Sequence, residues 1–180
     1  IINTCDSLVD WSTLRGTLQL DTVDKVEGIA SIKAIGNGIQ WDLIFAVYNP
    51  IGTWDFSLQN SITLRVKPQA LIGLGFVLWN DWQNAFVWDL SKPKYGMQVG
   101  VWNTVTIDLM APDAVAGVPN LAMIDFLDVR MQQPVGGESF NFDIIEALVA
   151  ITHALTVDSS PITAVPFTID DVGYVTPVSI

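Results

Sequence analysis

Alternation of apolar and polar residues along most of the chain is the feature that most restricts its fold. In Ser61–Lys67 every second residue is Ile, Leu or Val, and Thr, Arg and Lys stand between them. Ile39–Val47, Val105–Leu109 and Met123–Met131 follow the same pattern. Successive side chains of a β-strand point to opposite faces, so a period of two is typical of a strand with one buried face. The sequence therefore predicts an all-β protein.

Turn residues separate these segments at short intervals. Gly, Pro, Asn and Asp bound the alternating segments, and Asn37-Gly38 between two of them predicts a hairpin, because both residues tolerate a positive φ. About ten short strands at this spacing predict a two-sheet antiparallel β-sandwich. No Gly/Ser-rich linker or low-complexity tract divides the 180 residues, so we expect a single domain over 1–180.

Two segments do not follow the alternation. Ala111–Asn120 contains two prolines and a glycine and is predicted to be a loop. Asp143–Leu155 fits a strand and also the spacing of a short helix. We expect a strand there, followed by a short irregular or helical segment.

Composition excludes several kinds of partner. The net charge is −11 and no Lys/Arg cluster is present, which excludes nucleic acid and anionic lipid surfaces. Uncharged stretches such as Pro68–Asn80 fall short of the roughly 20 apolar residues of a spanning helix, so no membrane insertion is expected. Half of the residues are hydrophobic and 15% are charged, against roughly 25% in an average chain. Either the core is very large or something else covers part of the surface. Cys5 is the only cysteine, so neither an intrachain disulfide nor a thiolate metal site is expected.

Five segments, taken in order, resemble jelly-roll carbohydrate-binding modules and their galactose-binding-like relatives. Their features are an acidic residue shortly before a Trp, a Gly-x-x-Ser strand, an aspartate turn into a central strand, a Trp-x-x-Val-x-Ile-Asp-Leu strand and a closing Ile-Asp-Asp-Val strand. The segments that carry them are Cys5–Trp11, Val26–Ile32, Trp54–Lys67, Trp102–Leu109 and Phe167–Val172. The resemblance implies a jelly roll with a binding function. The same fold also hosts adhesins and virion proteins, so it does not name a ligand.

The resemblance also implies a structural calcium ion where the first and last strands meet. Calcium takes six to eight oxygen ligands from carboxylates and carbonyls. Asp6 and Asp170 match the family's positions, and the stretch that begins at Asp24 would complete the shell. Phe140–Ile145 also resembles the closing strand. Whether the sandwich closes with residues 140–146 or 167–175 is left open.

The seven tryptophans are candidates for sugar binding, because pyranose rings stack on flat aromatic side chains. A hairpin that turns at Asn80-Asp81 would place Trp79 and Trp88 on the same face, with Trp82 exposed in the turn. We expect these three tryptophans to form the ligand-binding site. The other four are expected in the core; they are Trp11, Trp41, Trp54 and Trp102.

The sequence contains few patterns that are typical of a catalytic site. His153, the single histidine, lies in an apolar stretch that favours a packed or edge residue over a base. Neither a Gly-x-Ser-x-Gly elbow nor a phosphate-binding loop is present. Asp143 and Glu146 stand three residues apart, so on a strand they point to opposite faces and make a poor glycosidase pair. We predict that the chain is not an enzyme.

Two functions fit these observations. The first is a non-catalytic module that binds a neutral glycan through exposed aromatic rings, since the acidic surface disfavours anionic polysaccharides. The alternative is a structural assembly protein such as a virion decoration, capsid or tail-associated jelly roll, because few polar residues are present to cover a monomer. The first predicts an extracellular location, and the second predicts the virion surface and contacts with other subunits. A homo-oligomer is compatible with both.

Overall fold

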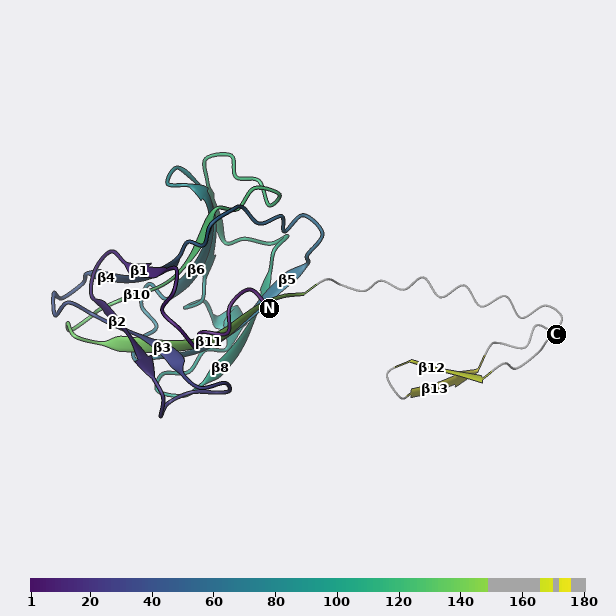
Figure 1. Cartoon of the computed structure of the whole chain (residues 1–180), viewed down its shortest axis with the longest axis horizontal. Helices are drawn as coiled ribbons and strands as arrows, with labels where there is room; N and C mark the ends of the chain where they lie inside the picture. The colour runs from purple at the N-terminus through teal and green to yellow at the C-terminus, as the bar shows by residue number, and fades with distance from the viewer. Residues whose placement is uncertain (149–165, 170–171, 176–180) are drawn as a thin grey trace. The chain divides into compact units, whose positions relative to one another are not determined.

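The computed structural model of the chain describes residues 1–148, 166–169 and 172–175 (Figure 1). It divides into two compact units, Ile1–Ala150 and Ile151–Ile180. In the described part of the first unit the regular secondary structure is β-strand, apart from one short 3-10 helix, η1 (Pro93–Tyr95). In the part of the chain described, no helix is long and apolar enough to cross a membrane.

Two antiparallel sheets form the first unit. The six-stranded sheet has the order β1-β4-β10-β6-β7-β9, and the five-stranded sheet has the order β2-β3-β11-β5-β8. The strands of the six-stranded sheet are β1 (Trp11–Thr13), β4 (Leu43–Tyr48), β10 (Phe126–Gln132), β6 (Gly75–Asp81), β7 (Asn84–Asp89) and β9 (Ala114–Ala116). Those of the five-stranded sheet are β2 (Thr17–Asp21), β3 (Ser31–Ile35), β11 (Ser139–Leu148), β5 (Ser61–Pro68) and β8 (Asn103–Asp108). This arrangement confirms the predicted two-sheet antiparallel sandwich.

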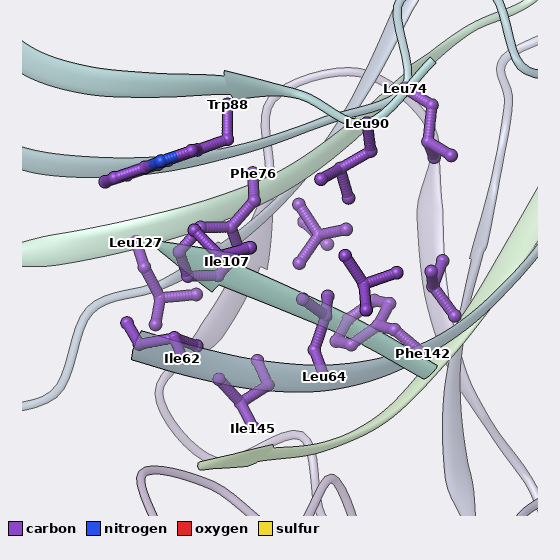
Figure 2. Packing of buried hydrophobic residues seen from close by; sticks show 14 of the residues in the cluster. Ile62, Leu64, Leu74, Phe76, Trp88, Leu90, Ile107, Leu127, Phe142 and Ile145 are labelled. Carbon is purple, nitrogen blue, oxygen red and sulfur yellow. The ribbon is translucent and has the colours of Figure 1, made fainter. Parts of the chain in front are cut away.

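The core lies between the two sheets and contains the apolar half of the alternating pattern. Figure 2 shows Phe76, Trp88 and Leu127 from the six-stranded sheet in the same interior as Ile62 and Ile107 from the five-stranded sheet. All five are fully buried. Burying one such side chain contributes about 1.5–3 kcal/mol, so the alternation itself supplies the force that holds the sheets together.

The segment 140–146 belongs to the sandwich. Strand β11 lies between β3 and β5 in the centre of the five-stranded sheet. Its pairing with β5 shifts between Asp143 and Ile145, where Ile144 has a φ of 41°. This β-bulge interrupts the period of two within the strand. In the second unit, β12 (Pro166–Ile169) pairs with β13 (Val172–Val175). The expected irregular segment and His153 lie outside the described residues, and a single domain over 1–180 stays a prediction.

Three local expectations are wrong. Asn37-Gly38 does not close a hairpin, because the flanking strands β3 and β4 belong to different sheets. The segment predicted as a loop contains the short edge strand β9. The alternation that begins at Ile39 does not continue as one strand, since β4 begins at Leu43 and Trp41 has a φ of 65°.

Substitution of Trp88 is the most direct test of packing in the core. We expect Trp88→Ala to lower the free energy of unfolding by about 3–5 kcal/mol, because the ring is fully buried. Its Nε1 donates to the Asp108 carbonyl at 2.8 Å. Trp88→Phe should cost less than Trp88→Ala, because it loses this hydrogen bond of about 1 kcal/mol but leaves a smaller cavity. Urea unfolding followed by circular dichroism measures both variants. Trp82→Ala is the matched control and should change stability by less than about 1 kcal/mol; equal losses at the two positions would contradict this assignment.

Candidate functional site

The outer face of the six-stranded sheet, meaning the face turned away from the core, is the candidate site. In β10, Val129 and Met131 belong to the core, so Asp128 and Arg130 project from the outer face. In β6, Phe76 and Leu78 belong to the core, which places Trp79 beside Asp128. The outer face therefore carries aromatic and charged side chains at its centre.

The hairpin β6–β7 separates the three predicted tryptophans. Phe76 pairs with Trp88, so these two side chains share the core face. The register shifts between Trp79 and Asp81, and the turn consists of Trp82 and Gln83 rather than Asn80-Asp81. This bulge moves the pairing by one residue, which reverses the face of every side chain beyond it. The expectation that Trp88 lies on the binding face is therefore wrong.

Trp79 and Trp82 form an aromatic cluster with Phe126. The Trp79 ring stacks on Phe126 with centroids 5.6 Å apart and planes 14° apart. Trp82 packs on the same Phe126 with centroids 4.5 Å apart and remains 60% exposed. The predicted exposure of Trp82 is thus confirmed. The buried Phe126 holds two partly open tryptophan rings in place.

A buried carboxylate fixes the centre of the outer face. Asp128 is 1% exposed and accepts hydrogen bonds from Trp79 Nε1 at 2.6 Å and Arg130 Nε at 2.9 Å. Burial raises the pKa of Asp128, although the charge of Arg130 and the hydrogen bond from Trp79 act to lower it. The Arg130 guanidinium lies over the rings of Phe45 at 5.5 Å and Trp79 at 5.8 Å. Arg130 is held on three sides and keeps further N–H groups for a ligand.

Two hollows share Asp81 and Asp125, and Trp82 lines the larger of them. One of about 450 Å³ is lined by Asn49, Thr53, Asp81, Trp82, Asp125 and Phe126, among others. A second of about 350 Å³ shares Asp81 and Asp125 and adds the side chains of Asn80, Asn84 and Asn120. Both hollows thus combine carboxylate and amide groups with apolar surface. No basic residue lines either one in the described part of the chain.

A third hollow, of about 350 Å³, lies beside Arg130. Gly75, Asp89, Lys92, Asp113 and Arg130 are among the residues that line it. Two basic and two acidic side chains therefore face this space, and their charges balance. This end of the outer face offers hydrogen-bond donors and acceptors together.

Asp113 organises the wall of the third hollow. It accepts hydrogen bonds from Lys92 Nζ at 2.8 Å, Tyr95 Oη at 3.2 Å and the Asp89 amide at 2.9 Å, and Lys94 Nζ lies 2.8 Å away. Burial acts to raise the pKa of Asp113, but these donors outweigh it and hold the pKa well below its ordinary value. The network ties the loop that contains η1 to the sheet.

Two of the three predicted metal ligands, Asp6 and Asp24, lie in the described part of the chain. Asp24 pairs with Lys67 Nζ at 2.6 Å and accepts a bond from Trp102 Nε1 at 2.9 Å, so its charge is already compensated. Asp170 lies outside the described residues. Within the described ranges, no group of three or more His, Cys, Asp or Glu side chains is arranged to hold a metal ion.

Asp143 lies where Asp170 was expected. Its Oδ2 accepts the amides of Val26 and Glu27 at 2.8 and 3.2 Å, whereas its buried Oδ1 has no hydrogen-bond partner. Asp6 holds the same loop through the amides of Ile29 and Ala30. Burial raises the pKa of Asp143, and the Asp6 carboxylate adds to this. The resemblance of Phe140–Ile145 to the closing strand was the sequence signal for this residue.

The four tryptophans that were predicted to lie in the core differ in their burial. Trp11 is buried, whereas Trp54 and Trp102 are only partly buried. Trp41 is 55% exposed, so its assignment to the core is wrong. Alternation placed it inward, and nothing in the sequence signalled its positive φ.

Comparison with solved structures identifies the fold. The family 11 carbohydrate-binding module of the cellulosomal cellulase Lic26A-Cel5E of Clostridium thermocellum superposes with a TM-score of 0.61 at 14% identity, covering 84% of this chain and 95% of that module. A family 11 module from Clostridium thermocellum in complex with a β-1,3-1,4-mixed-linked tetrasaccharide gives 0.59 at 16% identity, covering 84% and 95%. The family 30 module of the cellulosomal cellulase Cel9D-Cel44B of Clostridium thermocellum gives 0.56 at 15% identity, covering 79% and 87%.

These likenesses confirm the jelly-roll resemblance at the level of the fold. No protein-family model matches the sequence, and no curated protein matches it either. At these identities the shared architecture says nothing about the residues of a site. A function has to come from the side chains of the outer face itself.

Asp113 gives the outer face a pH-dependent contribution to stability. A carboxyl whose pKa is lowered in the folded state stabilises the fold above its unfolded pKa of 3.8 and loses that contribution as the pH falls. We expect Asp113→Asn to destabilise the protein by about 1–3 kcal/mol at neutral pH, allowing for the half-exposed lysines. The difference from wild type should shrink in acid. Urea unfolding at a series of pH values measures it, with the exposed Glu27→Gln as a control for net charge; a difference independent of pH would refute the mechanism.

Proposed function

We propose that this chain is a non-catalytic carbohydrate-binding module whose ligand lies on the outer face of the six-stranded sheet. One observation carries the proposal. The partly buried ring of Trp79 and the exposed ring of Trp82 pack together on the same face as a guanidinium that Asp128 holds fixed. Sugars present both C–H faces and hydroxyl groups, so a site for them combines flat rings with oriented donors and acceptors.

The electrostatics of the face support a neutral ligand. The hollow lined by Trp82 and the hollow lined by Asn80 both carry the carboxylates of Asp81 and Asp125. In the third hollow Lys92 and Arg130 are balanced by acidic neighbours. With a net charge of −11 for the whole chain, a polyanion would meet repulsion at one end of the face and no excess of positive charge at the other.

Preorganisation supports binding rather than a packing role for Trp79 and Arg130. The Arg130 side chain is pinned by two rings and a carboxylate, and the Trp79 ring by Phe126 and Asp128. Side chains that are already ordered lose little conformational entropy when a ligand binds. An extracellular location follows from this proposal and stays a prediction.

A neutral glycan array tests the proposed function, with the β-1,3-1,4-mixed-linked tetrasaccharide bound by the similar module as a first calorimetric probe. We expect Trp82→Ala to weaken binding by about 1–3 kcal/mol, the loss of one aromatic anchor, while stability hardly changes. Trp82→Phe should retain part of the affinity. Val23→Ala is a matched control, because Val23 is 91% exposed in the loop between β2 and β3 of the other sheet.

The assembly alternative predicts a different result. Several large apolar side chains are exposed, among them Ile51, Val118 and Val23. A chain that binds no glycan of the array and forms oligomers in light scattering would favour a subunit of a larger structure, at a virion surface for example. Glycan binding by a clean monomer would refute it.

We also propose that calcium binds between Asp6 and Asp143. The unpartnered Oδ1 of Asp143 and the nearby Asp6 carboxylate supply hard oxygen ligands, and both carboxylates already hold the loop at residues 26–30. Bound calcium would offset the repulsion between the two charges and stabilise this loop. Asp24 is left out because Lys67 compensates its charge.

Thermal unfolding with calcium and with EDTA tests this site. Calcium should raise the melting midpoint, because a ligand that binds only the folded state stabilises it. Asp143→Asn should abolish the shift and, in EDTA, melt above wild type, because it removes a carboxylate with a raised pKa that repels Asp6. Asp24→Asn is the control and should keep the shift. The same midpoint in calcium and EDTA would eliminate the site.

A further inference from the structure

Trp41 combines two properties that stability alone does not explain. Its side chain is 55% exposed, so the ring buries little apolar surface. Its φ of 65° lies in the left-handed region, where a bulky residue is a rare outlier. Such strain persists only where the surroundings enforce it, and it concentrates at functional sites.

The end of β10 enforces this conformation. The Trp41 amide donates to the Gln133 carbonyl at 2.6 Å, and Gln132 Nε2 donates to the Trp41 carbonyl at 2.9 Å. On the next residue, the Asp42 carbonyl accepts the Gln133 amide at 2.9 Å. The backbone of Trp41 is therefore held on both sides while its ring stays open to solvent.

Trp41 and Trp82 stand at opposite ends of β10. Gln132 is the last residue of the strand and lies two residues after Arg130, so its side chain also projects from the outer face. There it donates to the Trp41 carbonyl. Phe126, the first residue, carries the Trp82 ring. Seven residues of strand span about 20 Å. Along β10, Asp128 and Arg130 lie between Phe126, which contacts Trp82, and Gln132, which binds the Trp41 backbone.

We infer that Trp41 is a second aromatic platform for the glycan, and that the ligand is an extended oligosaccharide that runs along β10 from Trp82 to Trp41. The inference rests on the proposed function. A single sugar or a chain end would contact one platform only, because the two lie several pyranose widths apart. The strained backbone of Trp41 then has a role, since it holds an exposed aromatic residue at the end of β10.

Trp41→Gly separates the ring from the backbone. Glycine accepts a positive φ without a penalty, so the variant should melt higher than wild type, by roughly 2–8 °C. Its affinity for long chains should fall about tenfold, the contribution of one stacked ring. Its affinity for a mono- or disaccharide that contacts the Trp82 end should not change.

The experiment measures affinity against chain length by calorimetry, with β-1,3-1,4-mixed-linked oligosaccharides or the series of whichever sugar the array selects. Wild type, Trp41→Gly and Trp82→Ala are compared, with Val135→Ala as control, because Val135 is 77% exposed in the loop that follows Gln133. In wild type the affinity should rise up to the length that spans both rings. In Trp41→Gly it should level off at shorter chains.

The outcomes separate this inference from the proposed function. If wild type binds no sugar, the proposed function fails. If wild type binds and Trp82→Ala weakens binding, but Trp41→Gly matches wild type at every length, only the role of Trp41 is overturned. A Trp41→Gly variant that changes the oligomeric state without a length-dependent loss would also overturn it and make the ring a subunit contact.

Discussion

Packing of two half-apolar sheets against each other determines the direction of nearly every strand side chain in this sandwich. Once Phe76 and Leu78 of β6 face Ile62 and Ile107 of the other sheet, the residues between them must project outward. Because the period of a strand is two, the core and the outer face are two halves of one pattern. The candidate site therefore needs no separate scaffold, since the packing that stabilises the fold also orients Trp79, Asp128 and Arg130.

The outer face departs from an ordinary solvated surface at its centre. A carboxylate that is 1% exposed is tolerated only with strong partners, and Asp128 has Arg130 and the indole of Trp79. Meeting that requirement immobilises a planar cation and an aromatic ring side by side. The three hollows then extend the surface to both ends of the hairpin β6–β7. Rigidity at the centre and open polar space at the ends suit a ligand that lies across the face.

Much of the fold was predictable, and the site was predictable only in part. Alternation in Ser61–Lys67 indicated β5 correctly, because both the pattern and its turns are local. Trp82 was correctly expected in a turn and exposed. Trp88 was placed on the wrong face, since one bulged residue before the turn reverses the pairing of β7. Asp143 was not among the predicted ligands, because two segments resemble the same closing strand and Asp170 belongs to the other one.

The sequence by itself determined the class of fold and which residues of its clearest strands face the core, because periodicity is a property of the chain. Its net charge of −11 predicts that polyanions are poor partners. Only the tertiary structure decided which polar residues meet. Asp128 and Trp79 are far apart in sequence and touch because β10 pairs with β6. Trp41 and Trp82 belong to different loops, and the length of β10 sets their separation. Strand order, a single bulge and one left-handed residue are long-range outcomes of packing, and local pattern does not encode them.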